Sequence, residues 1–251
     1  MSSAALGDVT VIIPARNAAH TLPATLGCII GPVDADRPQV IVVDDGSIDA
    51  TSGVAVATGA GVRVLRTEGV GPGAARNVGI AAASTPLLAF CDADDLWPPG
   101  RLADDLAAFG TRPQLKVLLG RTRFDADDPT LLEGLHFDGD DLTAVIPHFG
   151  AATVRRAVFD ETGPILEGTP NYEDYDWFLR VREVGAELVV HDRVVLWRSV
   201  HGASMSRLRP PRPTELLDVL QRSVNRRRAE GHHGTLPRLT DLRHPIAEAP
   251  S

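Results

Sequence analysis

The chain has 251 residues, of which 43% are hydrophobic and 23% charged, a composition typical of globular proteins and not of disordered chains. Its net charge of −8 disfavours general binding to nucleic acid, whose phosphates would repel such a surface. Two cysteines, Cys28 and Cys91, give neither a disulfide framework nor a metal-ligand spacing. No apolar run approaches the roughly 18 residues of a membrane span and no signal peptide is visible, so we expect a cytoplasmic protein that could still contact a membrane surface.

The first half of the chain alternates short apolar runs with helical patterns. This alternation predicts an α/β fold with a central, mostly parallel sheet flanked by helices. The apolar runs are expected to form strands at 9–13, 40–43, 62–65 and 87–91. The helical patterns cover 22–30, 51–58, 74–83 and 102–109.

The second half is predicted to add strands and two helices and to end in a positively charged tail. The strands are expected at 116–124, from 151, at 188–190 and at 194–197, with a short helix after the second of them and a longer helix at 172–182. From residue 207 onward there are nine arginines and five acidic residues. One helix is expected there, at 214–228, in a tail that packs loosely on the rest of the protein or not at all.

The strand at 87–91 ends in three carboxylates, Asp92, Asp94 and Asp95. A Pro-Pro-Gly cluster just beyond them prevents the strand from continuing, so the acids sit at its carboxyl end. Ligands of open α/β sheets bind at that end, and carboxylate oxygens suit Mg²⁺ or Mn²⁺ shared with a ligand's phosphates. A solvated acidic turn is the alternative. We interpret two later acidic runs, at 125–128 and 138–141, as solvated loops.

Three other segments are expected near this edge of the sheet. The first strand runs into a P-A-R-N loop at 14–17, and the second ends in Asp44 and Asp45. A glycine-rich loop at 69–73 opens the third helix and delivers Arg76 just upstream of the acidic strand end. A guanidinium there could pair with a diphosphate, and a surface arginine on an exposed helix is the alternative.

Five motifs along residues 8–206 follow the order found in the inverting glycosyltransferases of family two, which have the GT-A fold, and the chain resembles that family. They are V-T-V-I-I-P-A-R-N, V-I-V-V-D-D-G-S-I-D-A-T, A-A-R-N-V-G-I-A-A-A-S-T-P-L-L-A-F-C-D-A-D-D-L-W, T-V-R-R-A-V-F-D-E-T-G, and Y-E-D-Y-D-W-F-L-R with the later R-S-V-H. The resemblance implies a GT-A domain over 1–206, with a nucleotide-binding half at 8–100 and an acceptor half at 101–206. The basic tail covers 207–251.

The resemblance also implies a nucleotide pocket, in which Asp45, with Asp44 beside it, accepts a hydrogen bond from the base and Arg76 binds the diphosphate. A carboxylate can read the ring N–H of uracil, which favours a UDP-sugar as donor. Arg16 stands where many members of the family carry an aromatic residue near the base. The residues implied for this pocket are Pro14, Ala15, Arg16, Asn17, Asp44, Asp45, Gly73, Arg76, Asp92, Ala93 and Asp94.

A divalent metal, Mn²⁺ or Mg²⁺, is implied by the resemblance of Asp92 and Asp94 to the D-x-D motif of the family. Asp94 is the implied metal ligand. Asp92, Asp95 and His201 are further candidate ligands, and their spacing does not decide which acid touches the metal.

The acceptor side is implied to lie at the start of the helix at 172–182. Asp174 matches the general base of the family, and an inverting displacement needs such a base on the acceptor face of the sugar. Glu173 and Trp177 are implied to border the acceptor. Stabilisation of the helix dipole is the alternative for Glu173, and core packing is the alternative for Trp177.

These features predict a metal-dependent inverting glycosyltransferase that moves a single sugar from a nucleotide-sugar to an acceptor hydroxyl or other nucleophile. A nucleotidyltransferase is one alternative, but it would normally carry a glycine-rich loop with a lysine directly after the first strand. A non-catalytic nucleotide-sugar-binding module of the same fold is another, although such a module could discard the base. The sequence indicates neither the acceptor nor the oligomeric state.

Overall fold

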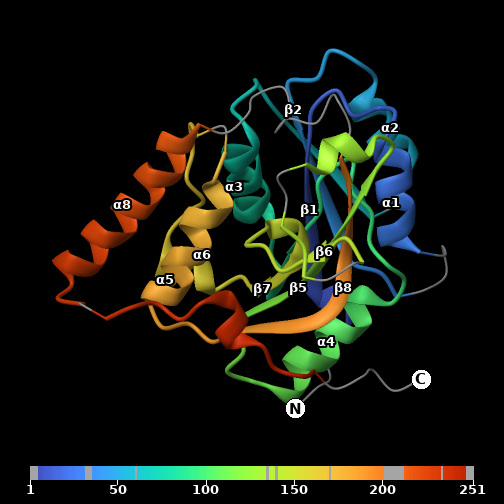
Figure 1. Ribbon diagram of the computed structural model, residues 1–251. Helices are drawn as coiled ribbons and strands as arrows, with labels where there is room; N and C mark the ends of the chain where they lie inside the picture. Colours follow the sequence, from blue (N-terminus) through green and yellow to red (C-terminus); the bar gives the residue numbers. More distant parts are fainter. Residues whose placement is uncertain are drawn as a thin grey trace.

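The computed structural model describes residues 5–31, 36–59, 61–133, 136–138, 141–169, 171–200, 212–232 and 234–246. Within these ranges, eight strands form one sheet in the order β3-β2-β1-β4-β7-β5-β6, with β8 paired to β5. Helices α1 and α2 lie on one side of the sheet, and α3 and α6 lie on the other (Figure 1). The predicted α/β class with a mostly parallel central sheet is confirmed.

The first half of the chain forms the parallel part of the sheet. Its strands are β1 (Val9–Ala15), β2 (Gln39–Asp45), β3 (Val62–Thr67) and β4 (Leu87–Phe90). β1 lies at the centre, where Ile12 is paired with Ile41 on one side and with Phe90 on the other. Since all four strands run the same way, their carboxyl ends meet at one edge, as the sequence predicts.

The helices between these strands are α1 (Leu22–Ile30), α2 (Thr51–Ala57), α3 (Pro72–Ala82) and α4 (Arg101–Thr111). α3 packs very close to the sheet because Gly79 has no side chain there. A Cβ on Gly79 would lie 2.4 Å from Cγ2 of Ile12 in β1. The small-residue sequence of α3 therefore sets how deeply the helix sits and how near it brings Arg76 to the strand ends.

The second half adds antiparallel pairing and extends the sheet. Its strands are β5 (Val117–Ala126), β6 (Thr143–Ala144), β7 (Ala152–Arg155) and β8 (Leu188–Val200), and its helices are α5 (Val158–Thr162) and α6 (Glu173–Glu183). β7 lies antiparallel between β4 and β5, and β8 runs parallel to β5. Short 3-10 helices are η1 (Leu6–Asp8), η2 (Pro129–Leu132), η3 (Phe149–Ala151) and η4 (Leu239–Leu242).

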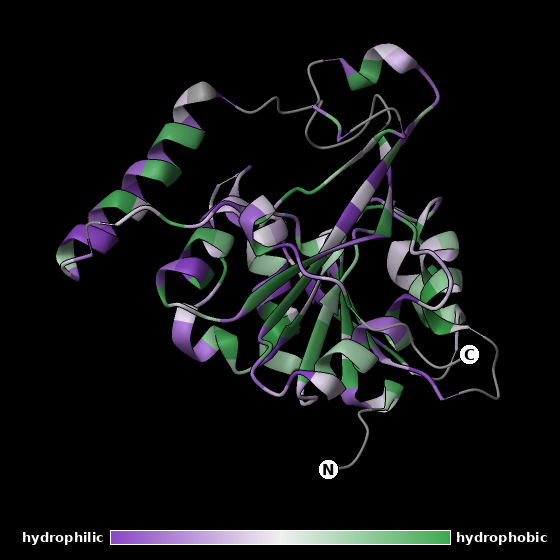
Figure 2. Ribbon diagram, turned by 60° about the horizontal axis from the view of Figure 1, so that its bottom comes forward, coloured by the Kyte–Doolittle hydropathy of each residue, from purple (hydrophilic) through white to green (hydrophobic). Residues whose placement is uncertain are grey.

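The core lies between the hydrophobic central strands and the helices that cover them (Figure 2). On the side of α6 it is aromatic. The ring of Phe149 lies 5.0 Å from Phe90 of β4 and 5.0 Å from Trp177 of α6, between ring centroids. Trp177 also stacks on Phe159 of α5 at 4.9 Å. This cluster fixes α6 relative to the end of β4.

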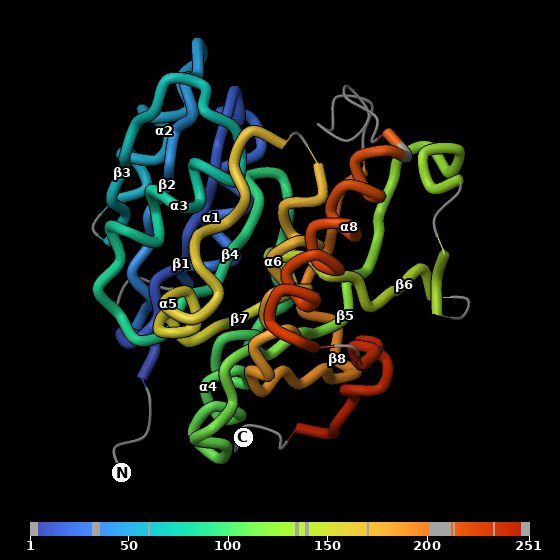
Figure 3. Tube along the Cα trace, turned by 90° about the vertical axis from the view of Figure 1, so that its left-hand side faces the viewer, coloured from blue at the N-terminus to red at the C-terminus, as the bar shows by residue number. Residues whose placement is uncertain are grey.

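The C-terminal segment packs more firmly than the sequence predicts. α8 (Pro213–Ala229) lies along α6 (Figure 3). Arg226 of α8 donates to Asp176 at 3.0 Å and to Glu183 at 2.7 Å, and both of these α6 carboxylates are buried. The expectation of a loosely packed tail is wrong for this helix, because buried acids on α6 are neutralised by an arginine from the tail. None of the described helices is long and apolar enough to cross a membrane.

Candidate functional site

The loops at the carboxyl ends of β1 and β2 hold each other in place. The backbone N–H of Asn17 donates to Oγ of Ser47 at 2.9 Å, and Oδ1 of Asn17 accepts from the N–H of Ile48 at 3.0 Å. Asn17 adopts a positive φ of 50°, a conformation that asparagine tolerates better than most residues. Pro14 is half-buried, Ala15 is buried and Arg16 is exposed.

The two acids that end β2 differ in what they bind. Asp44 is fully buried and accepts from the N–H of Ser47 at 2.9 Å and from the hydroxyl of Ser52. Burial opposes its charge, but these hydrogen bonds lower the pKa of Asp44. Asp44 is therefore satisfied within the chain, where it fixes the loop that follows β2.

Asp45 holds the glycine-rich loop. Its two carboxylate oxygens accept the N–H groups of Val70 and Gly71 at 2.7 and 2.8 Å and the hydroxyl of Thr67 at 2.6 Å. Despite burial, these bonds and the nearby charge of Arg16 lower its pKa. A carboxylate has about four acceptor positions, so the expected bond from a nucleotide base stays a prediction.

The start of α3 is tied to the loop before α6. A Cβ on Gly73 would lie 2.4 Å from the carbonyl oxygen of Leu166, so glycine is needed for this approach. The side chain of Asn77 accepts from the N–H of Ile165 and donates to its carbonyl, both at 2.9 Å. These contacts join α3 to the loop before α6 beside the predicted site.

The loop after β4 is pinned on both sides. The hydroxyl of Thr25 in α1 contacts the carbonyls of Ala93 and Asp95 at 3.1 and 3.0 Å. From the other side, the N–H of Ser199 in β8 donates to Oδ1 of Asp95 at 3.2 Å. Asp94 remains half-buried at the surface of this loop.

Arg76 is a buried arginine that pairs with two carboxylates. It is 3% exposed, and its Nη2 donates to Asp92 at 2.7 Å while Nη1 donates to Glu173 at 3.0 Å. Burial disfavours the guanidinium charge, but the surrounding carboxylates, with Asp92 foremost, raise its pKa. Nε of Arg76 is buried without a hydrogen-bond partner among the described residues, and the expected contact with a diphosphate stays a prediction. Glu173, expected at the acceptor, is engaged with Arg76.

Asp92 and Asp174 meet at one histidine. Nε2 of His148 lies 3.5 Å from Oδ2 of Asp92 and 3.8 Å from Oδ2 of Asp174. The two acids therefore lie close together, although the loop after β4 supplies one and the start of α6 the other. This convergence is the arrangement expected of a site with a donor side and an acceptor side.

The pKa values of Asp92 and Asp174 are shifted in opposite directions. Burial opposes the charge of Asp92, but the positive charge of Arg76, foremost, and the polar contact with His148 lower its pKa. Desolvation, reinforced by the negative charges of Glu173 and Asp92, raises the pKa of Asp174 to about 8. A pair of carboxyl groups whose environments separate their pKa values is typical of sites that assign them different roles.

A divalent cation fits the charge of this region. Two guanidinium groups face five carboxylates, and these groups belong to Arg76, Arg198, Asp92, Asp94, Asp95, Glu173 and Asp174. Burial and the charges of Asp92 and Asp94 raise the pKa of Asp95, and its Oδ2 is buried without a hydrogen-bond partner in the described part of the chain.

The described residues do not by themselves form a complete set of metal ligands. The described residues contain no ready-made group of three or more metal ligands. Magnesium and manganese bound with phosphates need only about one or two protein carboxylates, so Asp94 and Asp95 remain compatible with such a site. His201, the other expected ligand, lies outside the described residues.

Trp177 lies in the core and not at the surface. Its side chain is fully buried in the aromatic core, so the expected acceptor contact is replaced by the alternative of core packing. The neighbouring Tyr175 is 38% exposed and packs edge-on against Tyr172, with 5.3 Å between ring centroids. Burial, together with the nearby Tyr172 and Asp174, raises the pKa of Tyr175. An exposed aromatic ring therefore stands beside Asp174, one helix position after it.

His148 and Arg198 are site residues that the sequence patterns do not single out. His148 sits in an irregular segment just before η3, with no strand, helix or motif to mark it. Arg198 begins the R-S-V-H run after the predicted strand at 194–197, but the sequence pattern assigns it no role. In the structure it faces Asp95, Asp92 and other acids, whose charges raise its pKa although burial opposes this.

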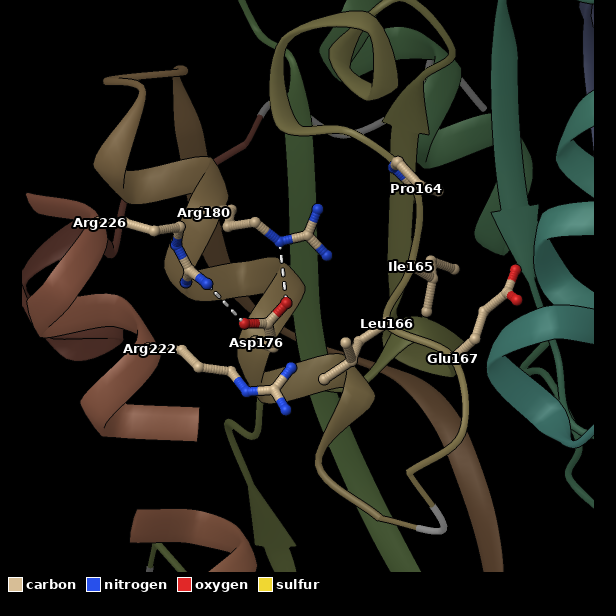
Figure 4. A pocket seen from close by; sticks show the side chains of 8 residues that line it. All are labelled: Pro164, Ile165, Leu166, Glu167, Asp176, Arg180, Arg222 and Arg226. Carbon is tan, nitrogen blue, oxygen red and sulfur yellow. Dashed lines mark hydrogen bonds and ion pairs between the residues drawn. The ribbon is translucent and has the colours of Figure 1, made fainter. Parts of the chain in front are cut away.

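A separate pocket of about 350 Å³ lies between α6, α8 and the loop at 164–167 (Figure 4). Its wall holds Arg222 and the ion pairs that Asp176 makes with Arg180 and Arg226, at 2.9 and 3.0 Å. Asp176 and Asp174 are two residues apart on α6, which turns their side chains about 200° from each other. The pocket therefore lies on a different face of α6 from Asp174.

Comparison with known proteins places these features in context. The family model described as glycosyl transferase family 2 matches residues 10–163. Succinoglycan biosynthesis protein ExoU of Rhizobium meliloti is 32% identical over 227 residues, covering 82% of this chain and 66% of that protein. Pre-mycofactocin glycosyltransferase of Mycobacterium tuberculosis is 32% identical over 196 residues, covering 72% of this chain and 40% of that protein.

Solved structures give the same picture of the fold. TarS 1–349 of S. aureus in complex with UDP-GlcNAc superposes with a TM-score of 0.68 at 19% identity, covering 86% of this chain and 65% of that one. The mannosyltransferase PcManGT from Pyrobaculum calidifontis, in complex with GDP-Man and Mn²⁺, gives 0.64 at 19% identity, covering 92% and 66%. The chain spans 66% or less of the length of these four proteins.

Proposed function

Because the chain belongs to glycosyl transferase family 2 and has the GT-A fold, we propose that it is a metal-dependent inverting glycosyltransferase. It moves one sugar from a nucleotide-sugar, a UDP-sugar in our proposal, to a nucleophile of an acceptor. The observation that carries the proposal is the convergence of Asp92 and Asp174 on His148. One acid belongs to the nucleotide-binding half and the other to the acceptor half.

The donor side is formed by the loops after β1, β2 and β4. Asp45 accepts a hydrogen bond from the ring N–H of uracil in this proposal, beside the exposed Arg16 and the loop that Asn17 anchors. TarS was solved with UDP-GlcNAc, which supports a uridine nucleotide, whereas PcManGT was solved with GDP-Man. Arg76 and Arg198 supply the positive charge on the phosphate side of the site.

The metal belongs to the same side. Asp94 and Asp95 would hold Mn²⁺ or Mg²⁺, and when bound the cation offsets the negative charge of the diphosphate leaving group. Relatives of this fold were solved with Mn²⁺ and, in glucosyl-3-phosphoglycerate synthase from Mycobacterium tuberculosis, with Mg²⁺ and UDP. Asp92, which Arg76 and His148 already engage, shapes the site rather than serving as the principal ligand.

The acceptor side is formed by the start of α6. Asp174 acts as general base for the acceptor hydroxyl, and the acceptor oxygen attacks the anomeric carbon from the face opposite the nucleotide. Such a single displacement inverts the anomeric configuration. The exposed ring of Tyr175 borders the acceptor in place of the buried Trp177. The identity of the acceptor is not part of the proposal.

The proposal is tested by nucleotide release. Purified protein with Mn²⁺ is incubated with a panel of UDP-sugars, and UDP is measured together with its effect on the melting temperature. We expect UDP release from at least one donor and a melting shift with UDP and Mn²⁺. Absence of both with every donor, with or without added acceptors, would remove the support for a glycosyltransferase.

Two variants make the assay specific to the acidic loop. Asp94→Ala is expected to weaken Mn²⁺-supported UDP binding by at least about tenfold, equivalent to about 1.4 kcal/mol. Asp127→Ala, in an exposed acidic run of similar composition, is the matched control and should leave UDP binding unchanged. Equal losses in the two variants would mean that the loop after β4 does not hold the metal.

A further inference from the structure

His148 has a fixed tautomer. It is 6% exposed, and its Nδ1 accepts the backbone N–H of Gly150 at 3.1 Å. A neutral imidazole carries one proton, so a ring whose Nδ1 is an acceptor carries it on Nε2. The ring therefore presents Nε2–H.

That N–H faces the two acids. Nε2 lies 3.5 Å from Oδ2 of Asp92 and 3.8 Å from Oδ2 of Asp174. These separations are longer than a hydrogen bond, but catalytic contacts are often long before substrate binds and shorten in the bound state.

The two oxygens of Asp174 have different surroundings. Oδ2 faces the imidazole, whereas Oδ1 is buried without a hydrogen-bond partner among the described residues. A buried carboxylate oxygen that lacks a donor is costly to the fold, by about 1–3 kcal/mol. Such an oxygen at a functional site is therefore a candidate for the atom that meets the substrate.

We propose that His148 is a positioning residue that donates through Nε2–H to Oδ2 of Asp174 and so leaves Oδ1 to take the proton of the acceptor. This inference rests on the proposed function. The acceptor O–H bond breaks, its proton passes to Oδ1, and the acceptor oxygen bonds to the anomeric carbon. The bond from that carbon to the diphosphate breaks with its electron pair leaving on the nucleotide. His148 keeps its proton throughout.

The position between Asp92 and Asp174 adds a geometric role. Since one N–H faces both carboxylates, the ring acts as a spacer between the donor side and the acceptor side. Glycine at position 150 leaves room for the ring, because a Cβ there would lie 2.8 Å from Nδ1 and from Cε1 of His148.

Two substitutions separate positioning from packing. His148→Gln retains an N–H donor of similar reach, and His148→Met retains side-chain volume without a donor. We expect His148→Met to lower kcat for UDP release from the active donor by about 10- to 100-fold, the range for losing one hydrogen bond to a charged group. The donor KM and the UDP affinity should change by less than about threefold, and His148→Gln should recover most of the loss.

The matched control is His191→Met. His191 is also buried, at 2% exposure, and its Nδ1 also accepts a backbone N–H, from Arg193 at 3.3 Å. Its charged neighbours are Asp104, Asp105, Arg101 and Arg193, none of which belongs to the proposed site. We expect a similar fall in melting temperature for the two methionine variants but an unchanged kcat for His191→Met. Equal losses of kcat in the Gln and Met variants of His148, or a loss confined to KM, would overturn the positioning role.

A spectroscopic measurement separates this inference from the proposed function. Imidazole nitrogen NMR of the wild-type protein should show His148 as the neutral tautomer protonated on Nε2, assigned by its disappearance in His148→Gln. A ring protonated on Nδ1, or on both nitrogens at neutral pH, would overturn the inference even if transfer is active. The expected tautomer in a protein that releases no UDP would instead refute the proposed function while leaving the hydrogen-bond geometry intact.

Discussion

The surroundings of Asp174 in the folded protein oppose the ionisation of its carboxyl group. Its side chain is 13% exposed, and burial together with Glu173 and Asp92 raises its pKa to about 8 from the ordinary 3.8. A base with a pKa near the working pH suits proton abstraction from a hydroxyl. The same placement should reduce stability when the group ionises, because the folded state then contains an uncompensated buried charge.

The sign of this effect gives a testable pH dependence. Between about pH 4 and 8 the folded protein retains a proton on Asp174 that the unfolded chain has lost, so stability falls as pH rises through that interval. Asp174→Asn removes the ionisation. We expect the variant to gain at least about 1 kcal/mol of unfolding free energy relative to wild type between pH 5 and pH 9, measured by urea denaturation, since one pKa unit is worth about 1.4 kcal/mol.

A pH-independent difference between Asp174→Asn and wild type would show that Asp174 ionises as an ordinary surface carboxyl. Glu173→Gln is the comparison variant, because Glu173 is adjacent in sequence but is paired with Arg76. Removing that partner leaves the buried guanidinium with one fewer counter-charge, so Glu173→Gln should be destabilising instead.

At the level of single residues, the sequence could locate the acids but not their partners. Asp92, Asp94 and Asp174 follow from strand-end and helix-start patterns, and Asp92 and Asp174 converge in the structure. His148 could not be found in this way, because its role depends on a tertiary contact from an irregular segment. The burial of Trp177 depends likewise on which face of α6 meets the core, which its local pattern does not settle.

At the scale of elements, the strands and helices of the first half lie close to their predicted positions. β8 is the instructive difference, since it continues from Leu188 to Val200 where two strands were predicted. The polar residues at 191–193 interrupt the apolar pattern, so the sequence indicates two short strands instead of one long strand. Register shifts in the β5–β8 pairing around Arg121 let the strand continue while Asp192 remains at the surface. Such a shift depends on the neighbouring strand and leaves no local signal.

The seating of α3 on the sheet gives a prediction at the same scale. Gly79→Ala places a methyl group 2.4 Å from Cγ2 of Ile12, so we expect a loss of about 1–3 kcal/mol of stability. Gly27→Ala in α1 is the matched control, because a Cβ there meets no atom within 4 Å. That substitution should stabilise the protein by about 0.5–1 kcal/mol through helix propensity. Chemical denaturation measures both, and stabilisation by Gly79→Ala would show that α3 is free to move outward.

For the whole molecule, the central feature is the meeting of segments that are distant in the chain. β4 supplies Asp92, α3 supplies Arg76, the segment before η3 supplies His148 and α6 supplies Asp174. The sequence predicts that the strand ends gather at one edge, because parallel strands require it. It does not predict that α8 packs along α6, because the contact depends on Arg226 finding Asp176 and Glu183 across more than 40 positions of the chain.

The proposed single displacement predicts inversion at the anomeric carbon, and this can be measured without knowing the acceptor. Proton NMR follows the first sugar released from an α-linked UDP-sugar when water takes the place of the acceptor, before the anomers equilibrate. We expect the β-anomer to appear first, and its formation to be lost in Asp174→Asn while UDP still binds. Initial release of the α-anomer would contradict the proposed single displacement.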